Sequence, residues 1–314
     1  MKGLELSRRY FEEYGRGMLE ERFPHLLNDL AAGLFGSGSE CYGFDDDLST
    51  DHDFEPGFLI LLKDTVSRID AFLLERAYAS LPKEYLGYKR QLIAPPGGPR
   101  HGVFYASEWF KEKTGSPDGH MDAYSWCTIP SHVLSEVTNG EVFFDPSGFL
   151  GEIRNSFASM PEEVLLKRLS SDLLYMGQSG QYNYSRCLKH GEKAAAQLAV
   201  DTFVRNGLDA LFLLNRTYMP YYKWSFKAAQ DLEKLYELPS LYEYLLLSGN
   251  EEEETEKKKE IIEEISSLLA LEIYTQGLCE RQENDLERLS YDLLKKVRNS
   301  DILGLEMFLL VGNI

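Results

Sequence analysis

The hydrophobic and polar positions of the chain follow two patterns, one in each half. Up to about residue 155, stretches with apolar residues three or four positions apart alternate with short apolar runs. These predict helices over residues 5–30, with a break or restart at Pro24, over 64–81, and over 122–138, with a break at Pro130. They also predict strands over 30–35, 58–62 and 101–107. From residue 161 the pattern is helical throughout. We therefore predict an α+β protein, with a small mixed sheet and helices in a domain over 1–155 and an all-α helical bundle over 156–314.

Two local signals refine this outline. Asn139-Gly140 lies between β-branched and aromatic residues, which predicts a hairpin over residues 136–144, either at the edge of the sheet or as a small appended ribbon. Pro161 is followed by two glutamates, a pattern typical of a helix start. The expected helices of the second half cover residues 161–178, 184–217, 224–236, 239–249, 255–278 and 284–297.

The stretch from Gly36 to Leu62 carries the candidate chemistry. Asp51 and Asp53 are one residue apart and lead into an apolar run, so on a strand both carboxylates would share one face. Like charges at this spacing repel unless a cation lies between them. The glycine–serine residues 36–39 would offer backbone N–H groups and hydroxyls to phosphates. We expect Asp51 and Asp53 to hold Mg²⁺ or Mn²⁺; a plain pair of acids at a strand edge is the alternative.

The same stretch resembles the nucleotidyltransferases of the DNA polymerase β type. Their pattern is a Gly-Ser pair followed after a gap by Asp-x-Asp, and here Gly38-Ser39, eleven residues and Asp51-His52-Asp53 match it. The pair Gly36-Ser37 fits almost as well. The sequences of four further segments resemble those of an uncharacterised bacterial family of nucleotidyltransferase-like proteins, a domain of unknown function with a helical C-terminal domain. These segments are residues 46–58, 100–103, 138–143 and 218–224. The resemblance extends over residues 5–240.

This resemblance implies a nucleotidyltransferase fold in the first half and an enzyme of that class. The reaction would move a nucleoside monophosphate from an NTP, with ATP favoured, to a hydroxyl of an unidentified acceptor. That acceptor would be a small molecule such as an antibiotic, an RNA or a protein, and a small molecule is favoured. Asp51 and Asp53 would be catalytic metal ligands, and Gly36, Ser37, Gly38 and Ser39 would bind the nucleotide.

The superfamily places a further carboxylate on a later strand, and the expected strand 101–107 contains none. Glu108 would share a face with Phe104 if that strand extends so far, which makes it our candidate general base; Asp122 and His101 are further candidates. The missing acid also leaves a second hypothesis open. The protein would then be a catalytically inert nucleotide-binding protein, or a regulatory or interaction protein, on the same fold.

In the helical half, Arg186, Tyr221 and Lys223 are our candidate nucleotide contacts. Cations and aromatic rings are suited to a triphosphate and a stacked base. The Pro-Tyr-x-Lys-Trp motif around Lys223 also resembles the sequences of the uncharacterised family. A helix start with packed aromatics and a solvated lysine is the structural alternative.

Composition narrows the range of partners. The net charge of −18, from 33 basic and 51 acidic residues, argues against general nucleic-acid binding. The 4 cysteines have no metal-binding or disulfide spacing, and no signal peptide or membrane-spanning run is visible. We expect a cytoplasmic protein with no membrane partner; its oligomeric state is left open.

Overall fold

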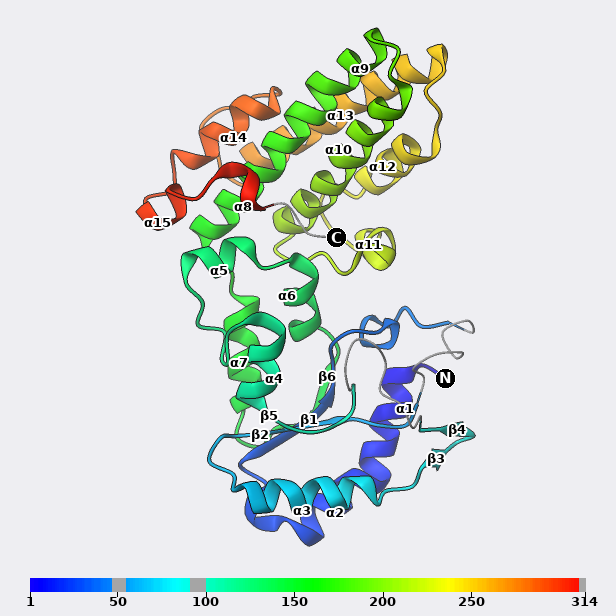
Figure 1. Cartoon of the computed structure of the whole chain (residues 1–314), viewed down its shortest axis with the longest axis vertical. Coiled ribbons are helices and arrows are strands. Elements are labelled where there is room, and N and C mark those ends of the chain that lie inside the picture. The colour runs from blue at the N-terminus through cyan, green and yellow to red at the C-terminus, as the bar shows by residue number, and fades with distance from the viewer. Residues whose placement is uncertain (47–54, 91–99, 311–314) are drawn as a thin grey trace. The chain divides into compact units, whose positions relative to one another are not determined.

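The computed structural model of the chain describes residues 1–46, 55–90 and 100–310 (Figure 1). Its contacts divide the chain into two compact units. The first consists of Met1–His120 and Val133–Ser159, and the second of Met121–His132 and Met160–Ile314. The first unit holds a small mixed sheet with helices, and the second is helical, so the predicted α+β class is confirmed. That these units act as a nucleotidyltransferase domain and a helical domain stays a prediction.

The main sheet of the first unit has the strand order β5-β2-β1-β6. The strands are β1 (Leu30–Leu34), β2 (Leu59–Leu62), β5 (Gly102–Tyr105) and β6 (Glu141–Phe144). Strand β1 is antiparallel to β2 and β6, whereas β2 is parallel to β5. Strands at three predicted places, 30–35, 58–62 and 101–107, are confirmed. This topology brings the end of β1 and the beginnings of β2 and β5 to one end of the sheet.

Both faces of the sheet are covered, which explains why its strands read as continuous apolar runs. Leu30 and Ala32 of β1 pair with Leu62 and Ile60 of β2, and all four side chains belong to one buried cluster. Helices α1 (Gly3–Tyr10) and α3 (Arg68–Ala79) contribute the other side of that cluster. Helices α4 (Ala106–Thr114) and α7 (Phe149–Ala158) lie on the opposite side of the sheet (Figure 1).

The helix expected over residues 5–30 is interrupted, and one break falls at Pro24 as predicted. After α1 the chain forms a π-helical turn, Phe11–Gly15, then α2 (Arg16–Arg22) and a 3₁₀ turn, Pro24–Leu26. The Pro24 ring fixes the backbone at the start of that last turn. A two-stranded ribbon of β3 (Glu84–Tyr85) and β4 (Tyr88–Lys89) follows α3.

The predicted hairpin over residues 136–144 is wrong in its first half. Residues before Asn139 form helix α6 (Ser131–Thr138), with Leu134 and Val137 buried on one side. A spacing of three places these two residues on one helical face, which outweighs the β-branched signal. Gly140 has φ +61° and turns the chain from α6 into β6. Strand β6 lies at the edge of the sheet, which was one of the two predicted positions.

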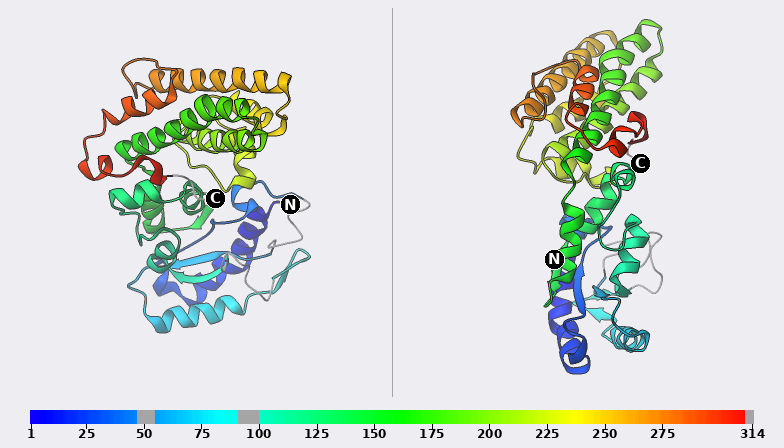
Figure 2. Two further views of the ribbon diagram at one scale, coloured as in Figure 1. Left: turned by 45° about the horizontal axis from the view of Figure 1, so that its top comes forward. Right: turned by 90° about the vertical axis from the view of Figure 1, so that its left-hand side faces the viewer.

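The second unit is a bundle built around α8 and α10, which pack side by side (Figure 2). Its helices are α5 (Ala123–Thr128), α8 (Glu162–Met176), α9 (Ser185–Lys189), α10 (Lys193–Leu214), α11 (Tyr222–Ala229), α12 (Leu238–Leu247), α13 (Glu252–Thr275), α14 (Leu286–Leu294) and α15 (Ser300–Leu303). A π-helical segment, Gly177–Tyr184, joins α8 to α9.

The single helix expected over residues 184–217 is two helices. Gly191 has φ +76° and separates α9 from α10, a conformation that glycine adopts without strain. In the parts of the chain that the structure describes, no helix is both long enough and apolar enough to cross a bilayer.

Candidate functional site

The glycine–serine turn at the end of β1 is a rigid element of the first unit. Gly36 and Gly38 have φ values of +119° and +134°, in the region that favours glycine. Asn139 fixes the turn from the loop before β6. Its Oδ1 accepts a hydrogen bond from the Gly36 N–H at 2.9 Å, and its Nδ2 donates to the Gly36 carbonyl at 2.9 Å. The turn is therefore held at both polar groups of Gly36.

Two cations flank this turn. The guanidinium of Arg100, just before β5, forms a largely buried ion pair with Glu40. It lies so close to Gly38 that a Cβ there would come within 1.5 Å of Arg100 Nη2. Lys113 of α4 lines a hollow of about 10 Å³ together with Gly36, Ser37 and Arg100. This hollow has about the least volume that holds one water molecule, so it suits a single oxygen of a larger anion.

A second ionic pair lies at the same end of the sheet. His101 Nδ1 is 3.0 Å from Glu55 Oε1, and both side chains are mostly buried. Asp51 and Asp53, the predicted metal ligands, lie outside the described residues. Within the described ranges, no group of three or more His, Cys, Asp or Glu side chains is arranged to hold a metal ion. The role of Asp51 and Asp53 as metal ligands therefore stays a prediction.

Glu108, the candidate general base, lies in a different setting from the one expected. Strand β5 ends at Tyr105, so Glu108 belongs to the first turn of α4. It is largely exposed and forms an ion pair with Arg68 of α3 at 2.7 Å. The glycine–serine turn lies beside the beginning of β5 and Glu108 beyond its end, so the structure does not bring them together. Trp109 and Lys113, later in α4, do reach the turn.

The three candidates in the second unit are also separated. Arg186 lies in α9, where it donates to the Tyr182 hydroxyl at 2.9 Å. Tyr221 lies beyond the other end of α10, a helix of 22 residues that spans about 33 Å. Lys223 Nζ lies 4.4 Å from the Trp224 ring centroid. Arg186 and Tyr221 therefore cannot contact the same small ligand within this unit.

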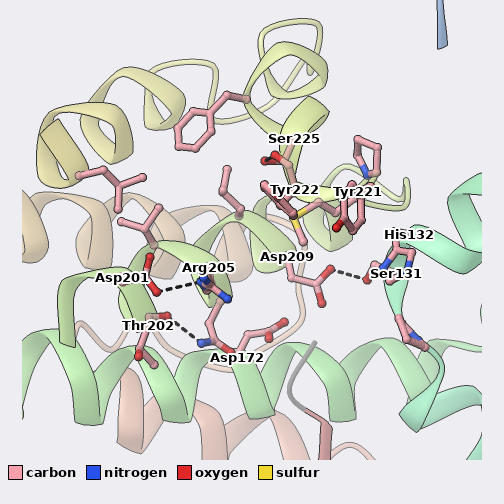
Figure 3. Close-up of a pocket in the computed structure, with 18 residues that line it drawn as sticks. Ser131, His132, Asp172, Asp201, Thr202, Arg205, Asp209, Tyr221, Tyr222 and Ser225 are labelled. Carbon is pink, nitrogen blue, oxygen red and sulfur yellow. Dashed lines mark hydrogen bonds and ion pairs between the residues drawn. The ribbon is translucent and has the colours of Figure 1, made fainter. Parts of the chain in front are cut away.

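Tyr221 instead lines a cavity of about 790 Å³ inside the second unit (Figure 3). This volume is in the range of small-molecule sites. Helices α8, α10, α11 and α12, the start of α6 and the residues just before α6 and α11 supply the wall. Its lining residues are Pro130, Ser131, His132, Asp172, Asp201, Thr202, Val204, Arg205, Asn206, Leu208, Asp209, Met219, Pro220, Tyr221, Tyr222, Ser225, Phe226 and Leu246.

Buried acids form the floor of this cavity, and sequence reasoning did not single them out. Asp209 accepts a hydrogen bond from the Ser131 hydroxyl, and its Oδ2 is 3.5 Å from Arg168 Nη2. Arg168 also donates to Ser131 Oγ at 2.7 Å and to the Ile129 carbonyl at 2.9 Å. Both carboxyl oxygens of Asp209 thus have a partner, Ser131 for Oδ1 and Arg168 for Oδ2.

Asp172 differs from Asp209. It is only 4% exposed, and its Oδ2 has no hydrogen-bond partner among the described residues. Burial raises the pKa of Asp172 well above its ordinary value, and the negative charge of Asp209 raises it further, while Arg168 lowers it. A charged residue within the apolar run of α8 was a signal available in the sequence.

Comparison with known proteins gives three results. Residues 126–225 match the family model of a domain of unknown function (DUF4037). No curated protein matches the chain. Among solved structures, the chain is similar to a nucleotidyltransferase-like protein from Exiguobacterium sibiricum 255-15, at 14% identity and a TM-score of 0.38, over 91% of this chain and 89% of that one. Every residue that lines the large cavity except Phe226 and Leu246 lies in the segment 126–225.

Proposed function

We propose that this protein is a magnesium-dependent nucleotidyltransferase. It would move a nucleoside monophosphate from an NTP, with ATP favoured, to a hydroxyl of a small-molecule acceptor such as an antibiotic. An RNA or protein hydroxyl is the other class of acceptor. The new P–O bond forms to the acceptor oxygen, which loses its proton, and pyrophosphate leaves.

The arrangement at one end of the sheet is the observation that carries this proposal. The glycine–serine turn leaves β1 there, and the segments that enter β2 and β5 arrive there. Glu55, two residues after Asp53, is already part of this end through its pair with His101. Paired acids that precede β2 would thus approach a turn with small residues and two flanking cations, which supports a triphosphate site.

We assign each candidate residue a role in metal or nucleotide binding. Asp51 and Asp53 would hold Mg²⁺, which would neutralise the charge of the triphosphate. Ser37, Ser39 and the backbone of the turn would bind its terminal phosphates, with Arg100 and Lys113 nearby. Tyr221 and Lys223 are proposed contacts to nucleotide or acceptor, and Arg186 is a further proposed nucleotide contact.

One observation favours a second candidate function. Strand β5 carries no acid, and Glu108 is engaged with Arg68 away from the turn. A protein that binds nucleotide at the same turn without turnover, in a regulatory or interaction role, fits this arrangement as well.

The first test is nucleotide-dependent stability. Thermal unfolding with each of the four NTPs, with and without Mg²⁺, is expected to show Mg²⁺-dependent stabilisation. A ligand at one hundred times its Kd adds about 2.7 kcal/mol. The double variant Asp51→Asn/Asp53→Asn is expected to lose this gain. Glu112→Gln, which removes one exposed charge of the same unit, is expected to keep it.

The second test separates the two functions. Pyrophosphate release is measured over a panel of hydroxylated small molecules, RNA and proteins. Release that requires both an acceptor and the two aspartates supports transfer. Stabilisation by Mg²⁺-NTP without release from any acceptor favours the inert protein, and no stabilisation of the unmodified protein by any NTP refutes both.

A further inference from the structure

The large cavity of the second unit has the construction of a binding site for a small molecule. Its walls combine apolar side chains from α10 and α12 with rings from the chain before and within α11. The Tyr221 ring centroid lies 4.5 Å from that of Tyr222 and 5.7 Å from that of His132. Such a wall offers flat faces for an apolar or aromatic body, and for a cation against a ring.

Charge decides the class of ligand. Three acids line the cavity, and two of them already have cationic partners. Asp201 pairs with Arg205 at 2.9 Å, and Asp209 faces Arg168. Asp172 has no such partner within ion-pair distance among the described residues. Among the described residues that line the cavity, Asp172 Oδ2 is the buried side-chain oxygen without a hydrogen-bond partner.

A buried carboxyl group without a donor is costly, and a ligand that supplies a donor relieves that cost. An anion would supply no donor to Asp172 and would lie against its carboxyl group, so it is disfavoured. A divalent metal ion prefers several free oxygen ligands, and the described residues contain no cluster of three candidate ligands here. A protonated amine needs one carboxylate and an aromatic neighbour, and both are present.

We infer that this cavity binds a small organic cation: a protonated amine that pairs with Asp172 and is carried on an apolar or aromatic body held by Tyr221 and Tyr222. The site requires neither a nucleotide nor a magnesium ion. The inference therefore goes beyond the proposed transfer reaction, and each can fail without the other.

Binding is expected to release a proton. The groups that face Asp172 are Arg168 and Tyr175 on its own helix, Asp209 on α10 and Tyr242 on α12. Because its pKa is raised, Asp172 holds a proton over a wider pH range in the empty cavity. Pairing with an ammonium group favours the carboxylate, so amine affinity is expected to rise with pH over the range in which Asp172 loses its proton.

The test uses matched probes. Phenethylamine, tryptamine and 2-cyclohexylethylamine are each compared with the alcohol of the same carbon skeleton, by isothermal titration without nucleotide. We expect at least one amine to bind about tenfold or more tightly than its alcohol, because a charged hydrogen bond is the stronger one. Titration in buffers of different ionisation enthalpy is expected to show proton release.

Two variants locate the effect. Asp172→Asn keeps the shape of the side chain and is expected to reduce amine affinity to that of the alcohol and to abolish proton release. Asp201→Asn changes an acid that already has a partner and is expected to leave the preference intact. The inference is overturned if every amine binds no more tightly than its alcohol, or if Asp172→Asn keeps the preference. Circular dichroism checks that both variants are folded.

Discussion

Replacement of Asn139 by alanine tests the construction of the glycine–serine turn. The variant removes both hydrogen bonds that hold Gly36, each 2.9 Å long and partly buried. One such bond contributes about 0.5–1.5 kcal/mol, so the loss is about 1–3 kcal/mol in the local stability of the turn. At tenfold for each 1.4 kcal/mol, amide exchange there should accelerate roughly 5- to 140-fold.

Hydrogen exchange followed by mass spectrometry measures this effect in peptides that cover residues 30–42. Asn28→Ala is the control, because no hydrogen bond of the Asn28 side chain occurs among the described residues; exchange should change less than twofold. We also expect Asn139→Ala to weaken Mg²⁺-ATP stabilisation if the turn binds phosphates. Exchange of the turn within twofold of the unmodified protein would refute the reasoning, because Asn139 would then contribute nothing to its rigidity.

Three further predictions concern single residues. Gly38→Ala would place a Cβ 1.5 Å from Arg100 Nη2, so it is expected to displace that ion pair and lower the melting temperature; an unchanged melting temperature contradicts this. Asp172 carries a raised pKa, so it should lower stability progressively as the pH rises from about 4. Asp172→Asn is therefore expected to melt above the unmodified protein at pH 7 and level with it near pH 4, and a difference independent of pH argues against this. Gly33→Ala would bring a Cβ within 2.4 Å of a backbone oxygen of β6 and should cost about 1–3 kcal/mol. Gly17→Ala, in open space on α2, should instead raise the free energy of unfolding by about 0.5–1 kcal/mol. If thermal unfolding shows that both substitutions stabilise the protein, or that both destabilise it, this account of the packing is wrong.

The elements that the sequence predicted well are those with a strong local pattern. The runs that form β1 and β2 are apolar on both faces because both faces of the sheet are covered. The errors arose where a local signal competed with packing. The residues before Asn139 have β-branched side chains, yet the buried spacing of Leu134 and Val137 makes them helical. The sequence analysis placed Gly191 inside one long helix, although its positive φ separates α9 from α10.

The candidate site shows the same limit. The glycine–serine turn can be recognised in the sequence, but the residue that fixes it is 103 positions away. Arg100 is likewise remote from Gly38 in sequence, and no local pattern connects them. The acids of the cavity, Asp172 and Asp209, stand inside apolar helical runs, and such a charge in an apolar run predicts burial. Which partners each acid finds depends on how helices pack, and this cannot be inferred from spacing alone.

The path of the chain affects how the protein can be divided for expression. Residues 121–132 precede part of the first unit in sequence, yet they belong to the second. A fragment that starts at Met160 would lack the Ile129 carbonyl and the Ser131 hydroxyl, and would leave the Arg168 guanidinium with too few acceptors. A fragment that ends at Ser159 would carry Trp126 without the helices that bury it. Neither fragment is expected to fold stably, so the whole chain is the appropriate sample for every assay above.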